Sequence, residues 1–572
     1  MPTPYAINAD RANGVAGKLT PRDLVSLGGI ATTVYGGLAR VSKPGVTIAP
    51  VAGSGADFDI GTNPSGINPA DTSAVFAAAL ASGNGVIGTP GPYPMYAGVA
   101  TAGNGLGLFA MQGGPAESSA VPQTPIGGKF NIVDYRAGAT TDLFKFSGNG
   151  IALDGVSFFA ESPGSPGQGT AQTHIHANYG SSIRNCNFFG GGQAGAAGLT
   201  DVGLLLDDLA YATVWASTFQ GANADNILVT NSGTDNVELF SVNVRKSVGN
   251  AIHVENIGGG PMTVVGGNYT NCGTALYLDC VTIPGFIGSI AVYGGQYDSC
   301  NPNNSLGQYG IVQFIGTTTN QYCRYVRFYG TGIENESASN LCYAVYITAQ
   351  MKDVMFQSCS INRSYYDNVY LDPWAIGQTP IVFLGGSNYN PSYNYSVDAT
   401  PQSCWNVAGN SLLVIRAVDF GYTSDYEGSG AGEQYGITFP SGGALTSGFV
   451  IIDGGSVQQL SSVFANLGNA YPGPNQGRYS RITNLAGYNP VRLLGTQPGT
   501  STSAVTNNLA TTGIMGPVEV HILIGSTATT VKKNGTFITG SLTNSAVTVS
   551  LDVQETVTLS QTTNVSWEWF GC

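Results

Sequence analysis

The chain has 572 residues, of which 10% are charged and 42% hydrophobic, and it carries 81 glycines and a net charge of −13. Low charge with a high apolar content excludes a largely disordered protein, and the negative charge argues against nucleic acid as a partner. No apolar run reaches the ~18 residues that predict a membrane span. The first residues lack the basic and apolar regions of a secretory signal, so we expect synthesis in a cytoplasm.

Residues 1–50 mix small and polar residues and lack the regular apolar pattern of the middle of the chain. We predict a separate N-terminal region here, suited to attachment. A short helix is expected to begin near Thr20 and Pro21, because threonine caps helices and proline is tolerated at their first position. Residues 51–150 are expected to contain a capping helix and the entry to the main domain.

The capping helix is predicted at residues 71–83. Asp71 or Thr72 can cap its start and Gly83 can end it. A Gly-Val strand with a Pro-Gly turn comes next, at 85–91. The apolar residues that fall on one face of this helix are Val75, Phe76, Ala79 and Leu80.

A short apolar phrase recurs through the middle of the chain and indicates a stacked solenoid. Each copy begins with a small residue or asparagine and continues with alternating apolar positions, and the copies start 23, 25, 24, 35, 34 and 24 residues apart. A period near 24 is typical of a parallel β-solenoid, in which each coil buries its apolar side against the next. The copies begin at Gly203, Asn226, Ala251, Ala275, Gly310, Ala344 and Asn368.

A second class of strand alternates with the first between Ile151 and about Ala486, within the β-helix that we predict for residues 151–494. These segments have period-2 apolar patterns interrupted by Gly or Asn, as in 263–269 and 290–297. Such residues suit corners that need a positive φ. About eleven such strands predict about eleven coils, so we expect an all-β fold with a parallel β-helix over this range.

Residues 495–572 are rich in Thr, Ser, Val and Asn and predict a small β-sandwich. Asn534-Gly535 is a strong signal for a tight hairpin turn. The sandwich is expected to serve in trimerisation or in carbohydrate binding. Its strands are predicted at 518–524, 529–533, 546–551 and 556–559.

The opening of the domain resembles that of the pectate-lyase-like β-helix superfamily, which is widespread in bacteriophage tailspikes. The resemblance lies in the Gly-Ala loop at 55–56, the Asp-Thr helix start at 71–72 and the strand and turn at 85–91, and the coil pattern extends it to about residue 490. It implies a right-handed parallel β-helix whose helix plugs the open end. It also implies a homotrimeric virion protein, made in the host cytoplasm, that attaches to the tail or baseplate through its N-terminal region and binds, and often cuts, bacterial surface polysaccharide.

Two acidic residues, Glu255 and Asp279, fall at matching outward positions on consecutive coils, which lie about 4.8 Å apart. Two carboxylates this close shift one pKa upward, which leaves a proton donor beside a stable carboxylate. Glycoside hydrolysis needs such a pair. His253 lies two residues from Glu255 and is expected to orient it. The alternative is that these carboxylates only keep the surface soluble.

A second acidic group with aromatic neighbours competes with this pair. Tyr and Trp rings stack on the C–H faces of sugars, although tyrosines on long loops can instead pack between subunits. The acidic candidates are Glu334, Glu336, Asp367 and Asp372. The candidate substrate-binding residues are His253, Tyr277, Tyr346, Tyr365, Tyr366, Tyr370 and Trp374.

We therefore expect a tailspike-like depolymerase that hydrolyses capsule or lipopolysaccharide O-antigen. A spike that only binds glycan is one alternative, since it needs the aromatic residues but no paired carboxylates. A polysaccharide lyase is weaker, because the available arginines do not stand at motif spacing to several carboxylates; they are Arg245, Arg324, Arg327 and Arg363. The nine cysteines lack Cys-x-x-Cys spacing and only four histidines are present, so we expect reduced thiols inside the solenoid and neither a metal nor a cofactor.

Overall fold

In a computed structural model the chain forms two compact units, Met1–Gln308 and Tyr309–Cys572. The helix predicted near Thr20 lies outside the described residues, and among the latter no helix is long and apolar enough to cross a membrane. The structure describes residues 46–49, 58–59, 71–110, 130–136, 141–160, 173–190, 200–207, 211–230, 236–255, 260–302, 307–335, 340–373, 379–391, 402–422, 434–440, 448–466, 480–487, 493–496, 504–507 and 517–571, apart from 84, 89–90, 178–179, 409, 459, 461 and 553.

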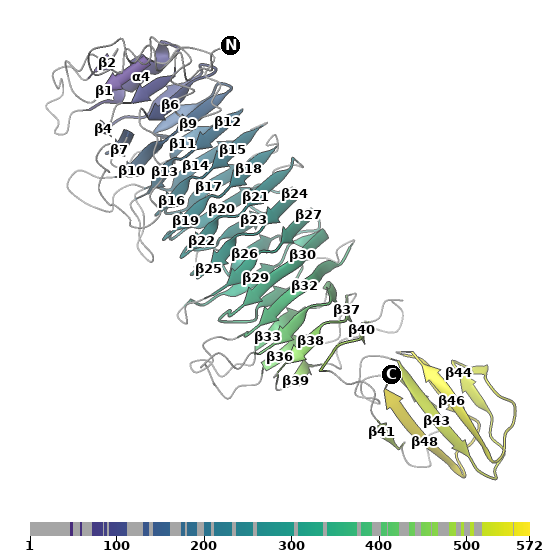
Figure 1. The fold of residues 1–572 in the computed structure, drawn as a ribbon. Coiled ribbons are helices and arrows are strands. Elements are labelled where there is room, and N and C mark those ends of the chain that lie inside the picture. Colours follow the sequence, from purple (N-terminus) through teal and green to yellow (C-terminus); the bar gives the residue numbers. More distant parts are fainter. Residues whose placement is uncertain are drawn as a thin grey trace, which may run out of the picture. The chain divides into compact units, whose positions relative to one another are not determined.

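Three rows of parallel strands run along the first unit, and from β3 to β23 each coil adds one strand to each row (Figure 1). The first row, which carries the recurring apolar phrase, contains β5 (Val99–Thr101), β8 (Phe144–Phe146), β11 (Thr173–Ala177), β14 (Val202–Asp207), β17 (Asp225–Thr230), β20 (Asn250–Glu255) and β23 (Leu276–Asp279). The second row contains β1 (Val46–Ala49), β3 (Val86–Gly88), β6 (Gly107–Ala110), β9 (Ile151–Asp154), β12 (Ser181–Arg184), β15 (Ala212–Trp215), β18 (Val237–Phe240), β21 (Met262–Val265) and β24 (Phe286–Tyr293). The third row contains β4 (Gly91–Met95), β7 (Phe130–Asp134), β10 (Val156–Ala160), β13 (Asn187–Phe189), β16 (Thr218–Gln220), β19 (Asn243–Arg245), β22 (Asn268–Thr270) and β25 (Gln296–Asp298).

Inward side chains at matching positions stack from coil to coil and form the core. Phe158, Phe188 and Phe219 are in register on three successive coils, with ring centroids 5.1 and 4.4 Å apart. In the first row, Ile227 and Ile252 are in register and fully buried. Each such side chain stabilises the fold by about 1.5–3 kcal/mol relative to exposure, so the stacking of coils supplies the burial that one coil lacks.

From β9 to β24, the corner after each second-row strand is a column of residues in the left-handed conformation. Its φ values lie between 45° and 72°, a region that favours Gly and Asn over other residues. The predicted need for positive φ at the coil corners is thereby confirmed. The column contains Gly155, Asn185, Ala216, Ser241, Gly266 and Gly294.

Gly266→Ala is expected to lower the free energy of unfolding by about 1 kcal/mol, because an L-residue in the left-handed region costs about that much. A Cβ at Gly266 would meet nothing within 4 Å, whereas one at the adjacent Gly267 would lie 2.2 Å from the carbonyl oxygen of Val242. Gly267→Ala is therefore expected to cost clearly more. Denaturant unfolding followed by circular dichroism measures both, and equal losses would contradict this corner geometry.

The capping helix is α4 (Ser73–Ala81), two residues shorter at each end than the predicted range. Phe76 is fully buried, and its ring packs 5.6 Å from Tyr93, 6.1 Å from Phe130 and 5.3 Å from Phe144. At its start, Asp71 Oδ1 accepts hydrogen bonds from the Ser73 backbone N–H and hydroxyl at 2.9 and 2.6 Å. The helix therefore covers the aromatic core of the first coils.

The second unit has the same architecture, with coils of its own. Phe328, Phe356 and Phe383 stack in register, with ring centroids 4.7 and 4.8 Å apart. Its first row contains β26 (Gly310–Ile315), β29 (Tyr343–Ile347), β31 (Val369–Leu371), β33 (Gln402–Val407), β36 (Gln434–Thr438) and β39 (Ser462–Ala465). The other strands are β27 (Tyr322–Tyr329), β28 (Gly332–Glu334), β30 (Gln350–Asn362), β32 (Ile381–Tyr389), β34 (Leu412–Arg416), β35 (Asp419–Gly421), β37 (Phe449–Asp453), β38 (Ser456–Gln458) and β40 (Arg481–Thr483).

The C-terminal part of the second unit forms two antiparallel four-stranded sheets with a common apolar core that includes Val520, Val531 and Trp567. Asn534 and Gly535 have φ values of 50° and 82° and join two paired strands, as predicted. One sheet contains β41 (Leu493–Thr496), β43 (Val518–Ile524), β46 (Ser545–Leu551) and β48 (Val565–Gly571). The other contains β42 (Ala504–Thr506), β44 (Val531–Lys533), β45 (Thr536–Phe537) and β47 (Thr556–Leu559).

The predicted all-β fold, a parallel β-helix with a capping helix and a small C-terminal β-sandwich, is confirmed. The eight described cysteines are buried free thiols, as expected. Burial raises the pKa of Cys186 and of Cys272 to about 12, which keeps these thiols protonated and unreactive.

Candidate functional site

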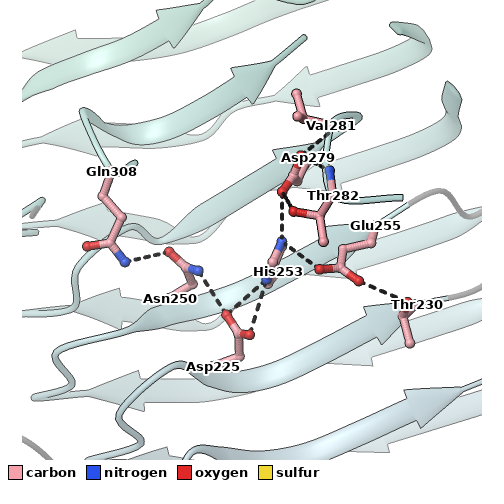
Figure 2. Close-up of polar contacts among 9 residues, drawn as sticks. All are labelled: Asp225, Thr230, Asn250, His253, Glu255, Asp279, Val281, Thr282 and Gln308. Atoms are coloured by element: carbon pink, nitrogen blue, oxygen red, sulfur yellow. Dashed lines mark hydrogen bonds and ion pairs between the residues drawn. The ribbon is translucent and has the colours of Figure 1, made fainter. Parts of the chain in front are cut away.

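His253, Glu255 and Asp279 meet on the outer side of the first row in the first unit (Figure 2). The strands β20 and β23 pair so that His253 is opposite Tyr277 and Glu255 is opposite Asp279. The Nε2 atom of His253 lies 3.5 Å from Glu255 Oε1 and 3.7 Å from Asp279 Oδ2. The two carboxyl groups therefore lie close together, and the histidine lies close to Glu255, as predicted.

The other ring nitrogen of His253 is held by Asp225, the first residue of β17. The Nδ1 atom lies 3.1 Å from each carboxylate oxygen of Asp225. Asn250 Nδ2 donates to the same carboxylate at 2.8 Å, and Gln308 Nε2 donates to Asn250 Oδ1 at 2.9 Å. This chain of hydrogen bonds sets the orientation of the imidazole, so that Nδ1 donates to Asp225 and Nε2 points at the other two carboxyl groups (Figure 2).

Both of those carboxyl groups have hydrogen bonds of their own. Thr230 Oγ1 donates to Glu255 Oε2 at 3.0 Å. Asp279 accepts from the backbone N–H groups of Val281 and Thr282 at 2.6 and 3.1 Å, and from the Thr282 hydroxyl at 2.6 Å. These contacts hold Glu255 Oε1 and Asp279 Oδ2 toward the imidazole.

The site is almost closed to solvent, since every residue of β20 and β23 is buried. The Glu255 side chain is 11% exposed and the Asp279 side chain 4%. The alternative that these carboxylates only keep the surface soluble is therefore wrong. Burial by itself lowers the pKa of His253, but the charge and hydrogen bonds of Asp225, with Asp279 and Glu255, outweigh burial and raise the pKa to about 10.

The two carboxyl groups are shifted in opposite directions. Burial raises the pKa of Glu255, and the charge of His253 with the Thr230 hydrogen bond offsets only part of the effect. Burial also acts to raise the pKa of Asp279, but the contacts with His253 and Thr282 outweigh it and bring the pKa to about 2. Glu255 therefore holds a proton more readily than an ordinary carboxyl group, and Asp279 stays ionised.

The same histidine arrangement occurs a second time, three coils earlier. His176 on β11 places Nδ1 2.9 Å from Asp142 Oδ2 and Nε2 3.3 Å from Asp207 Oδ2. In both copies, one aspartate is on the preceding coil, three residues before the residue that pairs with the histidine. The other aspartate is on the following coil, two residues after the residue that pairs with the histidine. We call this unit the Asp-His-Asp bridge, because it ties three successive coils together. The carboxylates around His176 are more exposed, at 20% and 31%, than the 8% and 4% of those around His253.

The donor atoms of His253, Glu255 and Asp279 all lie within 4.8 Å of one another. Among the described residues this is the one group of three such side chains close enough to hold a metal ion. The arrangement can therefore transfer a proton between two unlike carboxyl groups, or ligate a cation.

Tyrosines gather on the outer side of the first row in the second unit. Tyr346 and Tyr370 are in register and stack with ring centroids 5.0 Å apart and planes 8° apart. Tyr343 packs within 5.3 Å of both. We call the half-buried set the tyrosine platform, and it comprises Tyr309, Tyr343, Tyr346, Tyr365, Tyr366 and Tyr370. Four of the predicted sugar-stacking residues thus lie together.

The remaining candidates are scattered. Tyr277, in the first unit, packs on His253 with ring centroids 4.7 Å apart and is 9% exposed, so its face is not free to stack on a sugar. Glu334 ends β28 and is half-buried. Glu336 and Trp374 lie outside the described residues.

Asp367 and Asp372 flank β31 but differ in their surroundings. Asp367 is buried and accepts two hydrogen bonds of 2.6 Å from Ser403 and one of 2.8 Å from Asn406. Burial nevertheless raises the pKa of Asp367. Asp372 is exposed and accepts from Tyr370 Oη at 3.4 Å. These contacts make Asp367 a structural carboxyl group and leave Asp372 at the edge of the tyrosine platform.

Sequence reasoning missed Asp225, and with it both Asp-His-Asp bridges. The signal was present in the repeat, because alignment of Leu228 with His253 places Asp225 three residues earlier on the preceding coil. A comparison of positions that are in register on adjacent coils does not find these contacts, because each contact joins two residues that are offset along the strands. Tyr343 was missed for a similar reason, since it lies one residue before the aligned apolar phrase.

No protein-family model matches the sequence, and no curated protein matches it. Solved structures do match in fold. The Dettilon tailspike protein is 11% identical, with 88% of this chain and 91% of that one covered and a TM-score of 0.36. The enzymatically active domain of bacteriophage CBA120 tailspike protein 2 is 10% identical, with coverage of 88% and 74% and a TM-score of 0.33. The A-module of a mannuronan C-5 epimerase from Azotobacter vinelandii is 12% identical, with coverage of 73% and 96% and a TM-score of 0.31. Sequence identities of 10–12% indicate similarity in fold alone and assign no role to any residue of this chain.

Proposed function

We propose that this chain is a tailspike-like protein that binds a bacterial surface polysaccharide and hydrolyses it, with Glu255 and Asp279 as the reacting pair. The observation that carries the proposal is the pair itself, two adjacent carboxyl groups whose pKa values move in opposite directions. Glycoside hydrolysis requires one protonated and one ionised carboxyl group, and this pair supplies both.

The separation of the pair favours retention of configuration. Oxygens of Glu255 and Asp279 lie within 4.8 Å of each other, near the ~5–5.5 Å of retaining enzymes and below the ~6.5–9.5 Å of inverting ones. In the proposed reaction Glu255 protonates the glycosidic oxygen while the Asp279 carboxylate bonds to the sugar carbon, and the leaving sugar departs. Water then attacks that carbon, Glu255 takes its proton, and Asp279 is released. His253, held by Asp225, keeps both carboxyl groups in position.

The tyrosine platform supports glycan binding, because half-exposed tyrosine rings offer faces that stack on sugars. We extend the proposal to assembly on the basis of the resemblance at residues 55–56, 71–72 and 85–91 to tailspike openings. Residues 1–50 would attach a homotrimer to the virion tail or baseplate, residues 51–150 would lead into the β-helix at 151–494, and residues 495–572 would serve in trimerisation or carbohydrate binding.

A spike that binds glycan without cutting it is the second candidate. The burial of the site favours it, because a 4% exposed Asp279 side chain and three carboxyl groups around one imidazole also describe a structural ion cluster. The lyase alternative gains no support from Arg327, which pairs with Asp353 at 2.7 Å.

The decisive experiment incubates the full chain with purified capsule or lipopolysaccharide from a panel of bacteria. The proposal predicts new reducing ends from at least one glycan, with no rise in the ultraviolet absorbance that an unsaturated product would give. Binding without new reducing ends would favour the second candidate. A rise in absorbance would overturn hydrolysis in favour of elimination.

A further inference from the structure

We propose that His253, Glu255 and Asp279 bind a divalent transition-metal ion, with Zn²⁺ as the best match to the ligand set. One imidazole nitrogen and two carboxylate oxygens are ligands that zinc accepts, and three protein ligands leave a fourth position open to water or a sugar hydroxyl. The sequence predicted no metal site, because the cysteines lack Cys-x-x-Cys spacing and only four histidines are present. The set that converges through the pairing of β20 with β23 combines one histidine with two carboxylates.

The distances between the ligand atoms fit one ion. Zinc binds nitrogen and carboxylate oxygen at about 2.0–2.2 Å, so the ligands of a tetrahedral ion stand roughly 3.3–3.6 Å from one another. His253 Nε2 lies 3.5 Å from Glu255 Oε1 and 3.7 Å from Asp279 Oδ2. Small side-chain movements are enough to bring the carboxylates to these values, since the whole set lies within 4.8 Å.

The His253 ring is prepared for a ligand. Its side chain is 10% exposed, and Nε2 is a buried atom whose nearest polar neighbours, Glu255 Oε1 at 3.5 Å and Asp279 Oδ2 at 3.7 Å, lie farther away than in a normal hydrogen bond. The other nitrogen donates to Asp225, which is the contact that commonly orients a metal-binding histidine and sets its tautomer. A buried nitrogen directed at two carboxylate oxygens, with its opposite side held by a third carboxylate, therefore has the form of a metal ligand with its supporting residue.

The charges also favour a cation. Three carboxyl groups surround one imidazole, those of Asp225, Glu255 and Asp279, and no Lys or Arg among the described residues forms an ion pair with them. Buried charges are normally paired or coordinate metals. A divalent ion would balance the excess negative charge that the imidazole alone leaves.

The bridge at His176 provides an internal contrast. It repeats the two aspartates, but the sequence has Asn178 two residues after His176, where the later coil has Glu255 two residues after His253. Carboxylates and imidazoles suit zinc better than a neutral amide does. The later bridge is therefore expected to bind the ion and the earlier one is not.

This inference does not rest on the proposed hydrolysis. An ion on both carboxylates would prevent Glu255 and Asp279 from acting as acid and nucleophile, so metal-free protein is expected to cut the glycan and added ZnCl₂ to inhibit it. Cleavage that requires zinc would overturn the acid–nucleophile pair and leave the metal site standing. Cleavage without any uptake of zinc would support the acid–nucleophile pair and overturn the metal site.

The test uses the full chain after EDTA treatment and dialysis, titrated with ZnCl₂ in a calorimeter. We expect one ion per chain, binding weakened about tenfold or more in Glu255→Gln and in Asp279→Asn, and a 10–100-fold loss in Asp225→Asn, which removes the supporting carboxylate. His176→Gln is the matched control and should bind zinc as the native chain does. Equal affinity in the native chain, Glu255→Gln and Asp279→Asn would overturn the site.

A second measurement does not depend on whether the variants fold. CoCl₂ added to the native chain should produce the visible absorption of four-coordinate cobalt with nitrogen and oxygen ligands, and ZnCl₂ should abolish it. A six-coordinate spectrum, or no spectrum, would overturn the proposal.

Discussion

Replacement of Glu255 by Gln is expected to lower glycan turnover about 10²-fold or more while the glycan still binds. Gln keeps the size of the side chain and can still contact Thr230, but it cannot give up a proton to the glycosidic oxygen. A loss of 10² corresponds to about 2.7 kcal/mol of barrier. Asp279→Asn should lower turnover at least as much, because the reaction then lacks the anion at the sugar carbon. Reducing-end release at saturating glycan measures both.

The matched control for this experiment is Glu238→Gln, which makes the same chemical change on β18 in the second row. Glu238 is exposed and lies outside the site, so turnover should stay at the native level. Native activity in both Glu255→Gln and Asp279→Asn would contradict the proposed pair. The search would then move to Asp372, Asp367, Glu334 and Glu336.

The fold was predictable because a solenoid repeats its physical requirements in every coil. Each first-row strand needs apolar side chains at alternate positions, so Ile227 and Ile252 stand in the same place in the phrase. Each corner needs a left-handed residue, so Gly, Asn and Ser recur there. A spacing of about 24 residues therefore identifies both a strand and the strand that pairs with it on the next coil. The register between Glu255 and Asp279 followed from the same regularity.

The environment of the site was not predictable in the same way. Alternation distinguishes inward from outward positions, but β20 and β23 are buried at both, and what covers the outer side depends on side chains and segments from other coils. Asp225 reaches His253 diagonally. Burial raises the pKa of Glu255, whereas contacts with His253 and Thr282 outweigh burial and lower the pKa of Asp279. Such shifts depend on atomic contacts and desolvation, which a pattern of residue types does not contain.

His253→Gln is expected to lower the free energy of unfolding by about 3–5 kcal/mol in metal-free buffer, because it leaves Asp225 and Asp279 buried without their counter-charge. The side chains of these aspartates are 8% and 4% exposed, so water cannot replace the lost partner. Gln still offers an amide donor to Asp225, and the loss therefore reports mainly the missing charge.

His176→Gln makes the same change in the earlier Asp-His-Asp bridge and is the natural comparison. The side chains of Asp142 and Asp207 are 20% and 31% exposed, so water can solvate them once the imidazole is gone. The expected cost is about 1 kcal/mol, as for a partly exposed ion pair. Denaturant unfolding, with hydrogen exchange of β20 amides as a local measure, compares the two variants. Equal losses in the free energy of unfolding would show that burial of the carboxylates does not determine the strength of these bridges. The physical reason for distinguishing the His253 cluster from the His176 bridge would then be wrong.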